Sequence, residues 1–171
     1  MIRDLNKLIR YLAYVLELLV LFMLQETPGL LPPVLRERPV LLIPAALSIA
    51  FFETEITGMA FGVLAGLFLD FGMNAPFGFH ALLLGALCWL LGLLAAELIR
   101  TNLLTALLAG ALGVFLVLSL QWLFLYLLAG YGSAGYAYTR HYLPRMGYSF
   151  VFMPITYYFN RALALFLRER E

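Results

Sequence analysis

The chain has 171 residues, of which 64% are hydrophobic and 12% are charged, and its formal net charge is +1. Soluble domains average roughly 25% charged and 45–50% apolar residues, so this composition excludes an ordinary soluble domain and indicates a protein surrounded by lipid. The small net charge gives no reason to expect nucleic-acid binding, and the single cysteine, Cys88, excludes an internal disulfide and a zinc site built from cysteines.

A helix that crosses a membrane needs roughly 20 mostly apolar residues. Six apolar runs reach or approach this length. We therefore predict an all-α integral membrane protein with about six transmembrane helices in a compact bundle, forming a single domain over residues 1–171. The predicted spans are approximately residues 7–25, 39–52, 56–73, 79–99, 103–129 and 148–167.

The first span follows the basic residues Arg3, Lys7 and Arg10, as the apolar core of a signal peptide would. Its apolar stretch, residues 8–24, is longer than the roughly 7–15 residues of such a core, and no small-residue cleavage site follows it. We expect this segment to be retained as a membrane helix.

The second apolar run is the shortest, and residues 40–52 are few enough for a tilted or re-entrant segment instead of a full span. Glu53-Thr54-Glu55 separates this run from the third and is predicted to be a solvated turn. Two tilted spans and a re-entrant hairpin both keep the number of crossings even. Both termini are therefore expected on the same side of the membrane.

Lys and Arg residues indicate which side that is, because cytoplasmic loops carry more of them. With cytoplasmic termini, seven of the 11 basic residues lie inside and four lie outside, which is the expected direction. The inner residues are Arg3, Lys7, Arg10, Arg100, Arg161, Arg168 and Arg170, and the outer ones are Arg36, Arg38, Arg140 and Arg145. A polar and aromatic outer loop is predicted over residues 131–147.

The third span carries Gly58, Gly62, Gly66 and Asp70 at a spacing of four residues. Small residues at this spacing form a stripe on one helix face, where another backbone can approach closely. A carboxylate on that stripe is expected to face the contact and not the lipid, because a charge in hydrocarbon is costly. The stripe serves either an internal helix contact or a partner, and Asp70 is either a polar anchor there or a helix-end charge at the membrane surface.

A turn formed by Pro76, Phe77 and Gly78 precedes His80 at the start of the fourth span. A lone histidine near a helix start is most often a hydrogen-bonded structural residue. Asp70 and His80 supply only two ligands, whereas zinc sites use three or four protein ligands. We therefore predict neither a metal site nor a cofactor.

Glu17 lies near the middle of the first span, where an ionisable residue suggests a functional site. It is a candidate proton or ligand site, or a neutral group hydrogen-bonded within the bundle or to a partner subunit. Arg161, inside the last span, and Gln121 are its candidate partners. Glu97 and Arg100, three residues apart, are expected to form an ion pair within one helix.

Signatures of enzymes are missing from the sequence. There is no nucleophile elbow, no His-Glu-x-x-His and no phosphate loop. The only aspartates, Asp4 and Asp70, lie at different span ends, which does not suit an intramembrane protease. We predict that the protein is not an enzyme and has no catalytic residues.

Residues 38–84 resemble the family of the rod shape-determining protein MreD. Arg38-Pro39 leads into the apolar run VLLIPAALSIAF, and a glycine-rich helix ends with Gly66-Leu67-Phe68-Leu69-Asp70. Gly72 and Pro76-Phe77-Gly78 then precede Phe79-His80-Ala81-Leu82, as in that family. The resemblance is specific over about a quarter of the chain and elsewhere is a matching pattern of spans.

The resemblance implies a non-catalytic scaffold of the bacterial cytoplasmic membrane. Proteins of this family bind MreC and act with RodA, a class B penicillin-binding transpeptidase and MreB in lateral peptidoglycan synthesis and cell shape. Their fold is similar to the substrate-binding S components of energy-coupling-factor transporters, so a vitamin-type binding subunit is the alternative. S components carry an Ala-x-x-x-Ala surface on the first helix, and Ala13 has no small residue four positions later.

Overall fold

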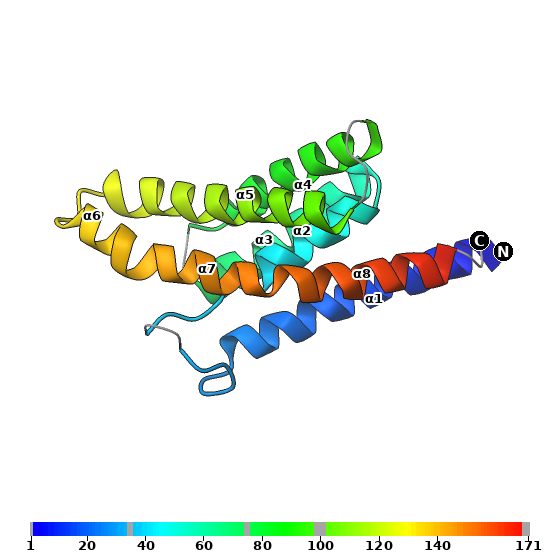
Figure 1. The fold of residues 1–171 in the computed structure, drawn as a ribbon, viewed down its shortest axis with the longest axis horizontal. Helices are drawn as coiled ribbons and strands as arrows, with labels where there is room; N and C mark the ends of the chain where they lie inside the picture. Colours follow the sequence, from blue (N-terminus) through cyan, green and yellow to red (C-terminus); the bar gives the residue numbers. More distant parts are fainter. Residues whose placement is uncertain (1, 34–35, 74–75, 98–101, 169–171) are drawn as a thin grey trace.

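The computed structural model describes residues 2–33, 36–73, 76–97 and 102–168, and every element in these ranges is helical (Figure 1). Two π-helical segments, Leu123–Leu127 and Tyr138–Tyr142, extend α5 and join α6 to α7. The helices are α1 (Ile2–Glu26), α2 (Leu42–Phe52), α3 (Glu55–Gly72), α4 (Phe79–Glu97), α5 (Leu103–Trp122), α6 (Ala134–Ala137), α7 (Leu143–Val151) and α8 (Met153–Arg168).

Several of these helices are suited to cross a membrane. Within the described residues, four helical segments are long and apolar enough: Leu5–Glu26, Glu55–Gly72, Phe79–Ala96 and Leu103–Leu127. Their outer surfaces are apolar too, since side chains such as Leu16 and Leu104 are 63% and 69% exposed. Lipid is the environment in which such surfaces are stable, and the chain is therefore an all-helical, multi-pass membrane protein.

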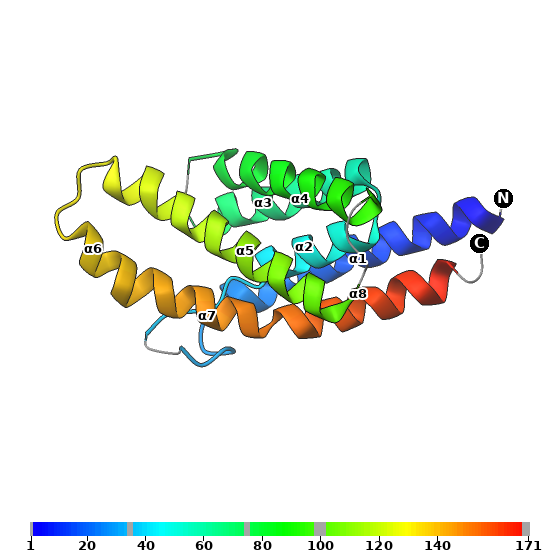
Figure 2. The ribbon, with the colours of Figure 1, turned by 45° about the horizontal axis from the view of Figure 1, so that its top comes forward.

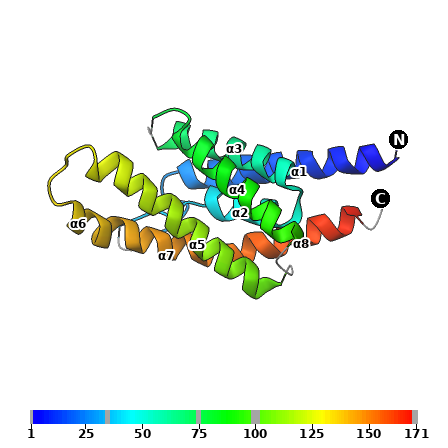
Figure 3. The same ribbon diagram turned by 90° about the horizontal axis from the view of Figure 1, so that it is seen from above.

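The helices run roughly along one common direction. The start of α1 and the end of α8 lie side by side at one end of the molecule, here called the terminal end (Figures 1 and 2). The opposite end, here called the distal end, is formed by the connection between α5 and α6, and α1 and α3 finish, and α4 begins, on that side but nearer the middle of the molecule (Figures 1 and 3). The arrangement puts both ends of the chain on the same side of the bundle.

The short helix α2 forms the centre of the bundle. Residues Leu42–Phe51 are all buried, and α2 packs against α1, α3, α4, α5 and α8 (Figures 2 and 3). Its 11 residues rise about 16 Å, whereas an apolar bilayer core is about 30 Å thick. The second apolar run is thus an internal helix shorter than the predicted span, and its apolar character on every side reflects burial by protein.

The chain enters α2 through non-helical backbone that other helices satisfy. The N–H of Val40 donates to Ser149 Oγ at 2.8 Å, and the N–H of Leu41 donates to Gln25 Oε1 at 3.0 Å. Irregular backbone at membrane depth is tolerated only where protein groups or water accept its hydrogen bonds. Gln25 and Ser149 therefore fix the position at which α2 begins.

Helices α3 and α4 form a closely packed antiparallel pair. A Cβ atom added to Gly62 would lie 2.7 Å from the carbonyl oxygen of Leu84, and one added to Gly66 would lie 2.4 Å from the backbone of Ala81. Gly58 faces α2, where an added Cβ would lie 3.0 Å from the Cβ of Ala50. The glycine stripe thus serves contacts inside the bundle.

Helix α4 contributes its own small residues to this pair. Gly85 lies against Val63, Gly92 lies against Glu55, and the fully buried Cys88 lies against Gly62. With Ala81, these residues recur every three or four positions along α4, so one face of the helix stays free of large side chains. Two backbones can then approach closely enough for dispersion contacts along their whole length.

The predicted loop over residues 131–147 is wrong for most of its length, because the chain is helical from Ala134 onward. Contacts with α5 hold this segment: Trp122 Nε1 donates to the carbonyl of Ala134 at 3.0 Å, and Ser119 Oγ lies 3.0 Å from the hydroxyl of Tyr138. The sequence pattern of small, polar and aromatic residues did not reveal these long-range bonds.

The last predicted span, residues 148–167, is divided between two helices. Helix α7 ends at Val151 and α8 begins at Met153. Pro154 explains the break, because proline has no N–H and its ring crowds the carbonyl four residues earlier, that of Phe150. The two helices nevertheless follow one another along one side of the bundle (Figure 1).

Candidate functional site

Asp70 ties the end of α3 to the beginning of α4. Its side chain is buried, with the residue only 4% exposed. Oδ1 accepts a hydrogen bond from the N–H of His80 at 3.0 Å, while Oδ2 accepts from the N–H groups of Gly78 at 2.8 Å and Ala81 at 3.4 Å. The first N–H groups of a helix have no partner within it, and their positive end favours a carboxylate. Asp70 therefore caps α4 from the preceding helix.

The conformation of the turn between α3 and α4 directs a backbone N–H group to Asp70. Gly78 has φ +92°, a left-handed conformation that side chains disfavour, and its N–H points at Asp70. Pro76 lies on the exposed side of the turn, where its carbonyl accepts from the N–H of Phe79 at 3.1 Å. The predicted candidates Pro76 and Gly78 thus shape the chain that Asp70 holds.

His80 completes the cap through its side chain. The residue is fully buried, and its Nδ1 lies 2.8 Å from Oδ1 of Asp70. Its Nε2 has no hydrogen-bond partner among the described residues. Within those residues, no group of three or more His, Cys, Asp or Glu side chains could hold a metal ion. Asp70 and His80 form an internal joint at the contact between the end of α3 and the start of α4.

Glu17 pairs with a residue that the sequence did not single out. Its Oε1 accepts from Nδ2 of Asn160 in α8 at 3.0 Å, so neither Arg161 nor Gln121 is its partner in this bond. Arg161 is exposed, and it lines a recess at the terminal end beside the Glu53–Glu55 turn. Gln121 donates to Sδ of Met73 at 3.6 Å. Hydrogen bonding to Asn160 gives Glu17 a structural role between α1 and α8.

The bond between Glu17 and Asn160 leads to a prediction. Glu17→Gln keeps the oxygen that accepts from Asn160, so the free energy of unfolding is expected to change by less than about 1 kcal/mol. Glu17→Leu removes that acceptor and is expected to cost about 1–3 kcal/mol. Thermal unfolding in detergent measures both. Loss of the protein's activity in cells by Glu17→Gln at unchanged stability would instead favour a proton or ligand role for Glu17.

The predicted solvated turn at Glu53–Glu55 is wrong for Glu53. That residue is 7% exposed, and its Oε1 lies 2.9 Å from Nε of Arg10 and accepts from the hydroxyl of Tyr14 at 3.0 Å. A carboxylate buried among apolar helices needs such a charged partner, because desolvation is costly. Arg10, which counted in the sequence only as an inner positive charge, is thus part of the packed bundle. The predicted Glu97–Arg100 pair lies outside the described residues.

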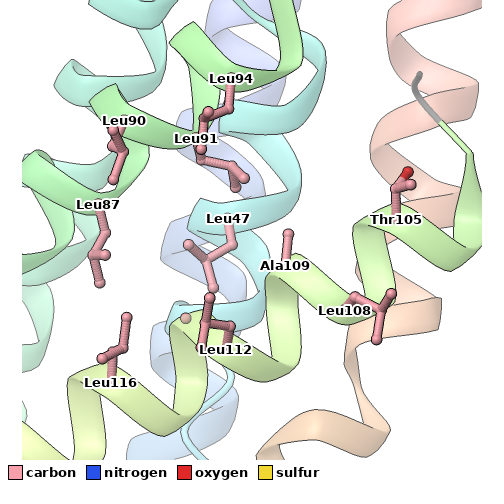
Figure 4. Close-up of a pocket in the computed structure, with 11 residues that line it drawn as sticks. Leu47, Leu87, Leu90, Leu91, Leu94, Thr105, Leu108, Ala109, Leu112 and Leu116 are labelled. Carbon is pink, nitrogen blue, oxygen red and sulfur yellow. The ribbon is translucent and has the colours of Figure 1, made fainter. Parts of the chain in front are cut away.

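An apolar groove separates α4 from α5 on the outer surface (Figure 4). Its cavity measures about 360 Å³, and leucines of both helices form its walls, with Leu47 of α2 at its floor. Along α5, Thr105, Ala109 and Gly113 line it at intervals of four residues. Small residues at this spacing on a membrane helix create a track that another helix can follow.

Sequence reasoning missed Asn160, Gln25 and Ser149, each of which bonds across helices. The available signal was the same for all three: a polar side chain inside or at the end of an apolar run. Comparison of the chain with family models, with curated proteins and with solved structures gave no match.

Proposed function

We propose that this protein is a non-catalytic scaffold of the MreD kind in the bacterial cytoplasmic membrane. In this proposal it binds MreC and, together with RodA, a class B penicillin-binding transpeptidase and MreB, helps to organise lateral peptidoglycan synthesis and cell shape. The resemblance of residues 38–84 is its starting point. One observation carries the proposal: residues of the resemblance that lie apart in the sequence contact one another where α3 meets α4. Asp70 accepts hydrogen bonds from Gly78 and His80, and Gly66 packs against the backbone of His80.

The proposal includes six membrane-embedded segments and cytoplasmic termini. These segments are α1, α2, α3, α4, the continuous helix from α5 to Leu127, and the broken helix from α6 to α8. The position of both chain ends at one end of the bundle supports an even number of crossings (Figure 1). The excess of basic residues that the sequence assigns to the side of the termini supports the cytoplasmic side. A likeness to the S-component fold is part of the same proposal.

The partner's single membrane helix is proposed to dock in the groove between α4 and α5. The glycine stripe of α3 is occupied by α2 and α4, so it offers no free surface to a partner. The groove lies on the outside and is apolar, and the small residues Thr105 and Ala109 line it, while Gly113 packs against Leu47 at its floor. Association of helices in lipid depends on close packing, which such a track permits.

Co-expression with a tagged MreC from the same genome tests the proposal. Ala109→Trp fills the groove, and we expect the amount of co-purified MreC to fall at least about tenfold, equivalent to roughly 1.4 kcal/mol of binding free energy. Phe115→Trp is the matched control, because Phe115 is 50% exposed on the same helix and does not line the groove. The control is expected to bind like the unmodified chain.

Three results would contradict parts of this proposal. Equal MreC recovery by Ala109→Trp and Phe115→Trp would exclude the groove as the docking surface. Failure of the unmodified chain to bind MreC, with the fold intact, would contradict the scaffold function itself. Saturable stabilisation by a vitamin in place of MreC binding would favour the transporter-subunit alternative.

A further inference from the structure

A polar cavity opens on the distal side of the bundle, and neither the Asp70 joint nor the proposed docking groove uses it. It measures about 280 Å³ and lies where α1 and α3 end, beside α5 and α7. The residues that line it include Gln25, Glu26, Arg38, Met73, Gln121 and Arg145. Polar side chains from four separate parts of the chain converge there.

Two guanidinium groups provide donors to this cavity. Arg38 is exposed at its rim. The Nε of Arg145 is buried, and no atom of the described residues accepts its hydrogen bond. An anionic group placed between these arginines would satisfy a buried donor.

Acceptors line the same cavity. Gln121 is only 6% exposed, and its Oε1 is buried with no hydrogen-bond partner among the described residues. Its amide nitrogen is already directed to Met73, which leaves the oxygen for a ligand. Glu26 adds a carboxylate whose Oε1 lies close to Gly72. A buried acceptor without a donor is costly, so a bound N–H group would stabilise this site.

We propose that this distal cavity binds a small zwitterion, whose phosphate or carboxylate group meets Arg38 and Arg145 and whose ammonium group donates to Gln121 and Glu26. The charges favour a zwitterion over a simple anion, because Glu26 lines the cavity and Glu37 lies near Arg145. The cavity lies at the ends of α1 and α3, two helices long and apolar enough to cross a membrane, and the hydrocarbon of a bilayer gives way to lipid headgroups where such helices end. The ligand is therefore either an ethanolamine-phosphate headgroup or a free molecule with the same groups.

Thermal unfolding of the purified protein in detergent tests the ligand chemistry. O-Phosphoethanolamine is expected to raise the melting temperature in a saturable manner. Phosphocholine carries the same charges without an N–H donor and is expected to bind at least about tenfold more weakly, as is inorganic phosphate. Equal effects of all three compounds, or no saturable effect of O-phosphoethanolamine together with no retained ethanolamine lipid, would overturn the proposal.

Two variants connect this binding to the cavity. Gln121→Leu removes the buried acceptor and is expected to weaken binding about tenfold, while the ligand-free protein unfolds at the same or a higher temperature. Arg38→Gln is expected to weaken binding as well, and its exposed position keeps it from disturbing the fold. Arg140→Gln, at an exposed residue outside the cavity, is the matched control and is expected to bind normally. Normal binding by both cavity variants would overturn the assignment to this site.

Native mass spectrometry distinguishes the two sources of the ligand. The protein is extracted from membranes that contain phosphatidylethanolamine, and retained lipid is compared between the unmodified chain and Gln121→Leu. Retention by the unmodified chain alone identifies the lipid headgroup as the ligand. Saturable binding of soluble O-phosphoethanolamine without any retained lipid identifies a free molecule. Equal retention by both proteins would overturn binding of the headgroup in this cavity.

Discussion

Asp70→Ala is expected to destabilise the protein by about 3–5 kcal/mol, because it removes a buried carboxylate that holds charge-assisted hydrogen bonds. The N–H groups of Gly78, His80 and Ala81 would lose their acceptor, and Nδ1 of His80 would lose its partner. The start of α4 would then detach from the end of α3. Thermal unfolding in detergent is the measurement, and a fall in melting temperature of roughly 10 °C is expected.

Asp70→Asn is the matched control for this loss. Asparagine keeps the shape and one oxygen acceptor, so it can still accept from part of the α4 N-terminus, although without the negative charge. Asp70→Asn is expected to lower the free energy of unfolding by about 1–2 kcal/mol, less than Asp70→Ala does. A melting temperature of Asp70→Ala equal to that of the unmodified chain would show that the cap contributes little to the fold.

Gly66→Ala is expected to destabilise the bundle by about 3 kcal/mol, at or above the upper end of typical overpacking. The added methyl group would lie 2.4 Å from backbone atoms of His80 and Ala81. A backbone cannot rotate out of the way as a side chain can, so α3 and α4 would have to separate. Thermal unfolding and the yield of monodisperse protein after purification measure the effect.

Gly147→Ala provides the control for the glycine substitution. An added Cβ at Gly147 meets nothing within 4 Å, and the residue lies within α7. Alanine there is expected to leave the protein unchanged or to stabilise it by up to about 1 kcal/mol, because glycine loses more backbone entropy on folding. Comparable losses from Gly66→Ala and Gly147→Ala would attribute the effect to glycine in general and not to the α3–α4 contact.

The two helices α3 and α4 also illustrate how far the sequence can be interpreted. The spacing of Gly58, Gly62 and Gly66 was visible in the sequence, because one helix turn relates these positions. The sequence did not show which helix packs against this stripe, because a face of small residues is equally suited to a neighbour in the same chain and to a partner. Only the packed structure assigns this face to α4 and α2.

Polar residues inside apolar runs were predicted less well. Glu17 was singled out, but its partner Asn160 lies 143 residues away, and no pattern within one helix relates the two. Glu53 was expected in water and is instead buried with Arg10 and Tyr14. Such pairs depend on which helices meet and at what depth, and this information is not contained in local spacing.

By itself, the sequence determined that the chain is an all-helical protein of the membrane and where most of its helices lie. That follows because hydropathy and helix length are local properties, set by the requirement that backbone groups in lipid bond within their own segment. The tertiary structure decided that α2 is internal, that residues 134–147 are helical, and that Asp70 caps α4. These features depend on contacts between segments far apart in the chain, where close packing and buried hydrogen bonds outweigh local preference.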